Sequence, residues 1–101
     1  MDDRELLELA AKASGIGLHV FYGDDYYPRP WDPLNNDGEA FRLAVKLNFQ
    51  FFISGADNEN GEYVPMHAVC EGEEEKIKGD PYAATRRAIV CAAAKIGRSM
   101  K

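Results

Sequence analysis

Long apolar runs are missing from this sequence. No segment approaches the roughly 20 apolar residues that a transmembrane helix needs. The first residues, Asp2, Asp3, Arg4 and Glu5, are charged and lack the basic and then apolar order of a secretory signal peptide. We therefore expect a protein that neither crosses a membrane nor is exported by a classical signal, and we predict a cytoplasmic location.

Cysteine and histidine are also scarce, with two of each in 101 residues. Cys70 and Cys91 are too few for a disulfide framework or a zinc site, so we interpret both as free, buried thiols in a reducing compartment. His19 and His67 lie on two expected strands, yet no HxH, HExxH or CxxC spacing accompanies them. We expect no metal and no cofactor.

Motifs of catalysis are absent as well. No serine or threonine lies in a context typical of an activated nucleophile. The segment Gly15-Ile16-Gly17 follows an expected helix, whereas a dinucleotide-binding glycine motif opens one. The acidic residues of the loop at 24–37 lack the spacing of an EF-hand. The sequence predicts no catalytic residues, and we expect a protein that is not an enzyme.

Charge is plentiful but unevenly placed. The net charge is −5, all 17 acidic residues lie within 1–80, and residues 81–101 hold five basic residues and no acidic one. The last helix is therefore expected to be a basic element on an acidic body. Its cations can pair with the body's own carboxylates and with the helix dipole, or contact a protein partner. We do not expect a nucleic-acid partner, because an acidic protein gains little long-range attraction to phosphates.

Helical periodicity is found in three segments. The expected helices run over about 3–14, about 39–48 and about 81–98. Each follows side chains that can cap a helix: Asp2, one of Asn35, Asn36 and Asp37, and Asp80. A chain of this length builds one hydrophobic core, so we expect a single domain over residues 1–101.

Alternating apolar residues predict a short antiparallel sheet of about three to four strands. One strand is expected over about 18–22. A hairpin is expected with strands over about 49–55 and 62–70, because Asn60–Gly61 is a strong turn signal between them. Packed by two to three helices, this sheet defines an α+β fold.

Three details of the sheet follow from its residues. Both faces of Phe49–Ile53 are apolar, which predicts cover on both sides of that strand, as in a layered sandwich. Pro65 lacks an amide donor, so its strand lies at an edge or carries a bulge. The acidic segment Glu71–Asp80 is interpreted as a solvated turn.

The segment 23–38 contains three prolines at close spacing and is expected to be a loop. Its aromatic residues can form a platform for a ligand or a peptide, or they can pin the loop to the core. Our candidate binding residues are Tyr26, Tyr27, Trp31 and Asp37 from this region, with Arg86 and Arg87 from the last helix.

Two segments resemble a known kind of protein. Residues 31–47, WDPLNNDGEAFRLAVKL, resemble the entry to the first core helix of small phage and prophage proteins grouped as phage α/β/α sandwich-domain proteins. Residues 80–90, DPYAATRRAIV, resemble their Ala-rich second helix. The resemblance implies two helices packed on an antiparallel sheet, in a phage gene product that acts in a bacterial cytoplasm.

The resemblance implies no activity and brings no catalytic residues. It leaves Trp31, Asp37 and Arg86 as residues that fix the structure. Asp37 is a candidate cap of the second helix, and Arg86 or Arg87 a candidate partner of a loop carboxylate.

Our leading hypothesis is a non-enzymatic accessory protein that binds a host or phage protein. It follows from the uneven charge and the aromatic loop. The alternative is a small-molecule or nucleotide binder that uses the loop at 24–37. A homodimer is also open, through the strand at 62–70 or through the flat surface of Ala92–Ala94.

Overall fold

A computed structural model describes residues 2–17, 19–20 and 29–100 of the chain. These residues form three helices, a three-stranded antiparallel sheet and a short two-stranded ribbon, which confirms the predicted α+β class. The helices are α1 (Asp3–Ser14), α2 (Asp37–Lys46) and α3 (Pro81–Ser99), and the strands are β1 (His19–Val20), β2 (Arg29–Pro30), β3 (Phe51–Asp57), β4 (Tyr63–Cys70) and β5 (Glu73–Lys76).

Side chains that precede the helices cap them as the sequence indicates. Asp2, Asn36 and Asp80 each accept a hydrogen bond from an N–H of the following first turn. Asp37 is the first residue inside α2, so the prediction that it caps this helix is wrong. Gly15 ends α1 with a φ of 74°, the left-handed conformation that glycine adopts most readily.

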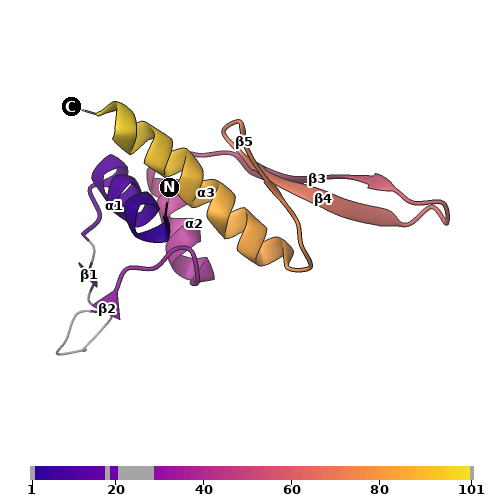
Figure 1. The fold of residues 1–101 in the computed structure, drawn as a ribbon, viewed down its shortest axis with the longest axis horizontal. Helices are drawn as coiled ribbons and strands as arrows, with labels where there is room; N and C mark the ends of the chain where they lie inside the picture. The colour runs from indigo at the N-terminus through magenta and orange to yellow at the C-terminus, as the bar shows by residue number, and fades with distance from the viewer. Residues whose placement is uncertain (1, 18, 21–28, 101) are drawn as a thin grey trace.

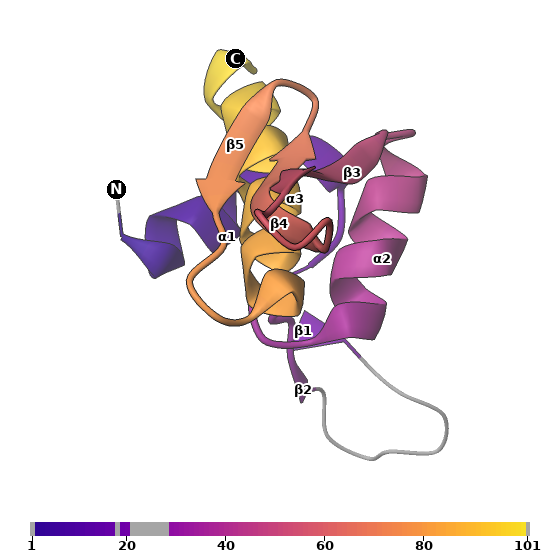
Figure 2. The same cartoon turned by 90° about the vertical axis from the view of Figure 1, so that its right-hand side faces the viewer.

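The layers of the body are ordered around α3. Helix α1 packs along one side of α3, and the sheet lies on the other side (Figure 1). Helix α2 also contacts α3, and it lies beyond β3 when the molecule is viewed along its length (Figure 2). Because every layer contacts α3, this helix is the centre of the core.

Small residues make this central position possible. The buried residues of α3 are mostly alanines, and Ala92, Ala93 and Ala94 lie inside the body. At Gly97 an added Cβ would collide with the carbonyl oxygen of Leu9 and would lie 2.8 Å from its carbonyl carbon. The expected dimer surface at Ala92–Ala94 is therefore wrong, because these residues are covered within one chain.

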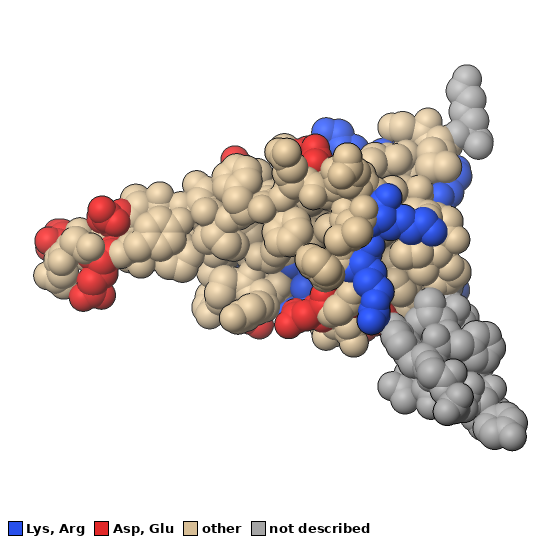
Figure 3. Space-filling view, turned by 180° about the vertical axis from the view of Figure 1, so that it is seen from behind, with Lys and Arg blue, Asp and Glu red and all other residues tan. Residues whose placement is uncertain are grey.

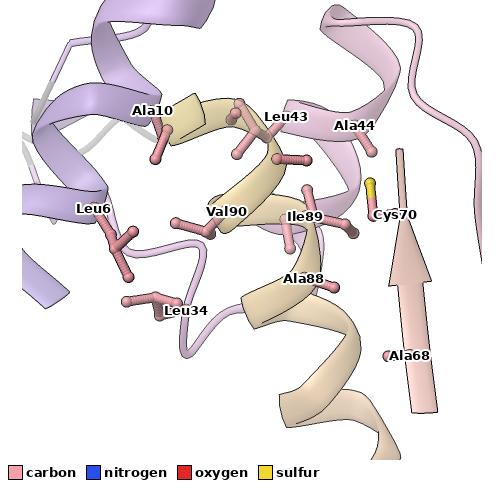
Figure 4. Close-up of a cluster of buried hydrophobic side chains, with 14 of the residues drawn as sticks. Leu6, Ala10, Leu34, Leu43, Ala44, Ala68, Cys70, Ala88, Ile89 and Val90 are labelled. Carbon is pink, nitrogen blue, oxygen red and sulfur yellow. The ribbon is translucent and has the colours of Figure 1, made fainter. Parts of the chain in front are cut away.

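Larger apolar side chains complete the core between α1, α2, α3 and the base of β4. Leu6, Leu43 and Val90 converge there, and Ala68 and Cys70 of β4 face the same cluster (Figure 4). The segment before α2 also joins the core through Trp31 and Leu34.

The sheet has the order β3-β4-β5, with β4 in the centre. Ser54 pairs with His67 and Gly55 with Pro65, so Met66 of β4 is left as a bulge next to Pro65. This confirms one of the two predictions made for that proline. Its strand is not at an edge, because β3 and β5 flank it. The expected dimer contact through the edge of 62–70 is wrong for the same reason.

Strand β5 lies where a solvated turn was expected. Glu73–Lys76 pairs with His67–Cys70, and the two strands are joined at Glu71 and Gly72, both with positive φ. Two consecutive residues of positive φ are typical of a tight type I′ hairpin turn. This turn returns the acidic segment to the sheet.

The sheet does not have helical cover on both sides. Phe51 and Phe52 are 41% and 58% exposed, so the prediction that Phe49–Ile53 is buried on both faces is wrong. The reason is topological: α3 lies on one side of the sheet, and α2 lies beyond the edge of β3 (Figure 2).

Part of the expected strand 18–22 and loop 23–38 lies outside the described residues. His19–Val20 pairs with Arg29–Pro30 as the ribbon β1–β2. Two residues of the expected loop are therefore in a strand, and Pro33 to Asn36 lead from the ribbon into α2.

Candidate functional site

The hairpin of β3 and β4 projects from the body, and residues 51–70 are called the arm below. The molecule measures 52 × 34 × 24 Å, and the arm forms one end of its long dimension (Figure 1). Every residue from Ser54 to Met66 is exposed. The outer part of the arm therefore has no place in the core.

Several large apolar side chains of the arm are exposed. Phe52, Tyr63, Val64 and Met66 are large side chains that face solvent. The ring of Tyr63 lies against Gly55, and its hydroxyl donates to the carbonyl oxygen of Ile53 at 3.2 Å. Clustered apolar side chains on a protein surface mark a contact site more often than scattered ones do.

The outer edge of the arm is the edge of β3. Within the described part of the chain, β3 pairs with β4 alone. The edge from Phe51 to Ala56 carries no charged residue, and the arm contains no Lys or Arg. Edge strands that must stay unpaired usually carry a lysine or another device against pairing. The edge of β3 therefore carries no charge against a further strand, although the hairpin has a bulge beside Gly55 and the carbonyl oxygen of Ile53 already accepts from Tyr63.

A groove of about 410 Å³ lies at the base of the arm. Its apolar lining comes from α2, β3 and α3, and consists mainly of Ala40, Phe41, Phe51, Ile53, Tyr82 and Ile89. The groove also contains the ion pair of Arg86 and Asp37. Phe41 and Tyr82 are themselves well exposed. The apolar surface thus continues from the arm onto the body.

Charge is separated along the side of the molecule that runs from the tip of the arm to α2. Asp57, Glu59 and Glu62 lie at or beside the tip of the arm, while Arg42 and Lys46 are exposed on α2. Figure 3 shows carboxylates at the tip, basic side chains interspersed with some carboxylates over the body, and a largely uncharged surface between them. The order along this side is therefore acidic, apolar and basic.

The candidate residues from the aromatic loop are placed differently. Tyr26 and Tyr27 lie outside the described residues. Trp31 is 4% exposed and belongs to the core. Asp32, which follows Trp31, links this segment to α2, because its N–H donates to the carboxylate of Glu39 at 2.5 Å. Trp31 therefore has almost no free surface for a ligand.

Asp37 and Arg86 come together, but as a structural pair. Arg86 Nη1 donates to Asp37 Oδ1 at 2.6 Å, and its Nε donates to the carbonyl oxygen of Leu34 at 2.8 Å. These bonds join α3 to the start of α2.

Arg87 is not near this pair. Its Nη1 donates to Asp3 Oδ1 at 2.9 Å, and its Nε lies 3.8 Å from Glu75. Lys95 lies 3.6 Å from Glu73. These cations of α3 face carboxylates of their own chain, in agreement with the first interpretation of the basic helix.

Both cysteines are free. Burial raises the pKa of Cys70 to about 12. Burial and the nearby Glu75 raise the pKa of Cys91 to about 11. At neutral pH both therefore remain thiols, and the thiolate is the nucleophilic form.

The described residues contain neither a candidate metal centre nor a candidate membrane span. No three or more His, Cys, Asp and Glu side chains gather there in a way that could hold a metal ion. No helix there is long and apolar enough to cross a membrane.

Comparison with protein-family models, with curated proteins and with solved structures found no match.

The exposed aromatic residues of the arm and groove were missed by the sequence prediction. Phe41, Phe52, Tyr63 and Tyr82 were assigned to helices or strands with no binding role. One signal was available: no Lys or Arg occurs between Lys46 and Lys76. Such a stretch is unusual in an exposed hairpin, because exposed strands usually carry charged side chains.

Proposed function

We propose that this chain is a non-enzymatic protein-binding module that works through the arm and the groove at its base. The observation that carries the proposal is the long, uncharged and unpaired edge of β3. An exposed edge of this kind adds a strand from another chain by main-chain hydrogen bonds, and neighbouring pockets give specificity.

The groove supports the same function. It lies beside β3 and is lined by Phe41, Phe51 and Tyr82. Aromatic residues are enriched in the energetic centres of protein interfaces. A chain paired with β3 brings its side chains next to these rings.

We further propose that the protein comes from a phage or prophage and acts in a bacterial cytoplasm. This part rests on the resemblance of residues 31–47 and 80–90 to small phage proteins. The partner is then a host or phage protein. The alternative of a ligand site in the loop at 24–37 gains nothing from Trp31, which is buried.

Site-specific photo-cross-linking tests the binding function. A cross-linking amino acid is placed at Phe52 on the arm and, as a control, at Glu8 on the exposed face of α1, and the chain is produced in bacterial cells. We expect protein adducts from position 52 and none from position 8. Equal adducts at both positions, or none at position 52, would contradict the proposal.

A further inference from the structure

We propose that the arm and groove take a second copy of the same chain, in a two-fold symmetric dimer. This inference rests on the proposed function and names one partner for that surface. It follows from the order of charge along one side of the molecule, from the acidic tip over the apolar arm to the basic face of α2.

A two-fold axis reverses the direction of the second copy. The acidic tip of each copy then lies over the basic end of the other, and the two apolar stretches meet in the middle. An isologous interface needs this kind of surface, one that is complementary to itself. Arg42 and Lys46 of α2 are exposed, and neither belongs to an ion pair within the described residues.

The length of the arm fits this arrangement. Strand β3 spans Phe51–Asp57, so its centre is Ser54. Antiparallel pairing about that centre places Asp57 of one copy opposite Phe51 of the other. Residues 58–62 of the tip then extend past the start of the other β3, to the end of α2 and Lys46. The two three-stranded sheets become one sheet of six strands.

The exposed area is also sufficient. Phe41, Phe51, Phe52, Tyr63 and Tyr82 are each between 41% and 68% exposed. At roughly 200 Å² for an aromatic side chain, they present about 500 Å² in each copy. A standard interface buries about 800 Å² on each partner. Phe51 and Phe52 point to opposite faces of β3, so the rings on one face supply part of this area and main-chain pairing along the edge supplies more.

Charge reversal tests the arrangement. The tip variant carries Glu59→Lys and Glu62→Lys, and the α2 variant carries Arg42→Glu and Lys46→Glu. A control variant carries Glu5→Lys and Glu8→Lys on α1, which changes the net charge as much as the tip variant does. Sedimentation equilibrium gives the dimer Kd of each, and circular dichroism confirms that each is folded.

We expect the wild-type chain to dimerise. The tip and α2 variants should each raise the dimer Kd at least about tenfold, because like charges then face each other at both ends. The control variant should change it by less than about threefold. An equal mixture of the tip and α2 variants should form a heterodimer, since every contact in it again joins opposite charges.

Two results would overturn the inference. One is a wild-type chain that stays monomeric at every concentration measured. The other is a folded pair of variants that does not associate on mixing. If the chain is monomeric yet position 52 still cross-links to a different protein, the binding function stands and only the second copy is excluded as its partner.

Discussion

The body and the arm of this protein both contain many apolar residues, but of different size and placement. In the body, α3 buries mostly alanines, and its neighbours approach closely enough to exclude a side chain at Gly97. In the arm, phenylalanine, tyrosine and methionine face solvent. Apolar area stabilises a fold only when it leaves water. The buried residues of the body, with Ala68 and Cys70 at the base of the arm, therefore stabilise the monomer, whereas the exposed apolar residues of the arm are available for a contact.

The largest expected difference in unfolding free energy is between the variants Leu43→Ala, in the body, and Phe52→Ala, in the arm. Leu43 is 0% exposed, so its truncation should lower the free energy of unfolding by about 3 kcal/mol. Phe52→Ala should lower it by less than about 0.5 kcal/mol. Urea denaturation at low protein concentration measures both without a contribution from association. A similar cost for the two variants would mean that the arm is part of the folding unit.

Gly97→Ala is expected to cost about 2 kcal/mol, because a methyl group there meets the backbone of Leu9 and forces α1 away from α3. The matched control is Gly38→Ala, also in a helix. An added Cβ there lies 3.3 Å from Asn36 Oδ1, the atom that caps α2, which needs to shift by only a few tenths of an ångström. Its unfolding free energy should change by less than about 0.5 kcal/mol. A stable Gly97→Ala variant would show that the helix contact is loose.

Stability should also depend on pH through Cys70. Its pKa is raised from 9.0 to about 12 in the folded chain, so above about pH 9 the unfolded chain releases a proton that the folded chain retains. The thiol's contribution is therefore complete below pH 9 and is lost as the pH rises from 9 to 12. At about pH 10 the loss should be about 1 kcal/mol. Denaturation at pH 8 and 10 measures it.

Cys70→Ala is the control for this pH effect. It lowers stability at both pH values but should remove about 1 kcal/mol of the difference between them. An unchanged difference would mean that other groups cause the alkaline loss.

The smallest effect on stability is expected for Gly55→Ala. A Cβ at this position collides with the carbonyl oxygen of Val64 and lies 2.9 Å from Tyr63 Cζ. The two strands of the arm should separate there, and amides of the arm should exchange faster with solvent, whereas global stability should change by less than about 0.5 kcal/mol. Hydrogen exchange measured by NMR distinguishes local opening of the arm from global unfolding. Ser54→Ala, a substitution at the neighbouring position, is the control. Faster exchange throughout α3 would show that arm and body unfold together.

The helices could be predicted from the sequence because their signals are local. Asp2, Asn36 and Asp80 lie directly before the segments that they cap, and the apolar spacing that follows spans only a few turns. The α+β class follows from these helices and from the alternation in the hairpin. The role of Gly97 could not be predicted from local signals, because glycine is required there by contact with Leu9, which is far away in the sequence.

The sheet was less predictable because its arrangement depends on distant partners. Strand β5 has the sequence Glu-Glu-Glu-Lys, which no local preference marks as a strand. It forms because the turn at Glu71–Gly72 returns it to β4.

The candidate site was missed for a similar reason. Apolar residues on both faces of 51–53 are equally compatible with a buried strand and with an exposed arm. Only the placement of the helices on one side of the sheet decides between these. Trp31 shows the reverse case, an aromatic residue in an expected binding loop that the fold buries.

The contact of α1 with α3 also sets the order in which the chain can fold during synthesis. Lys12 donates to the carbonyl oxygen of Met100, and Arg87 to Asp3, so each bond closes a loop of more than 80 residues. The ribosome releases α1 first, but α1 cannot form its main contact until α3 has emerged. The arm is a local hairpin and can form well before that. A nascent chain therefore exposes its apolar arm and the uncovered side of α1 together, and chaperones bind exposed apolar surface of this kind.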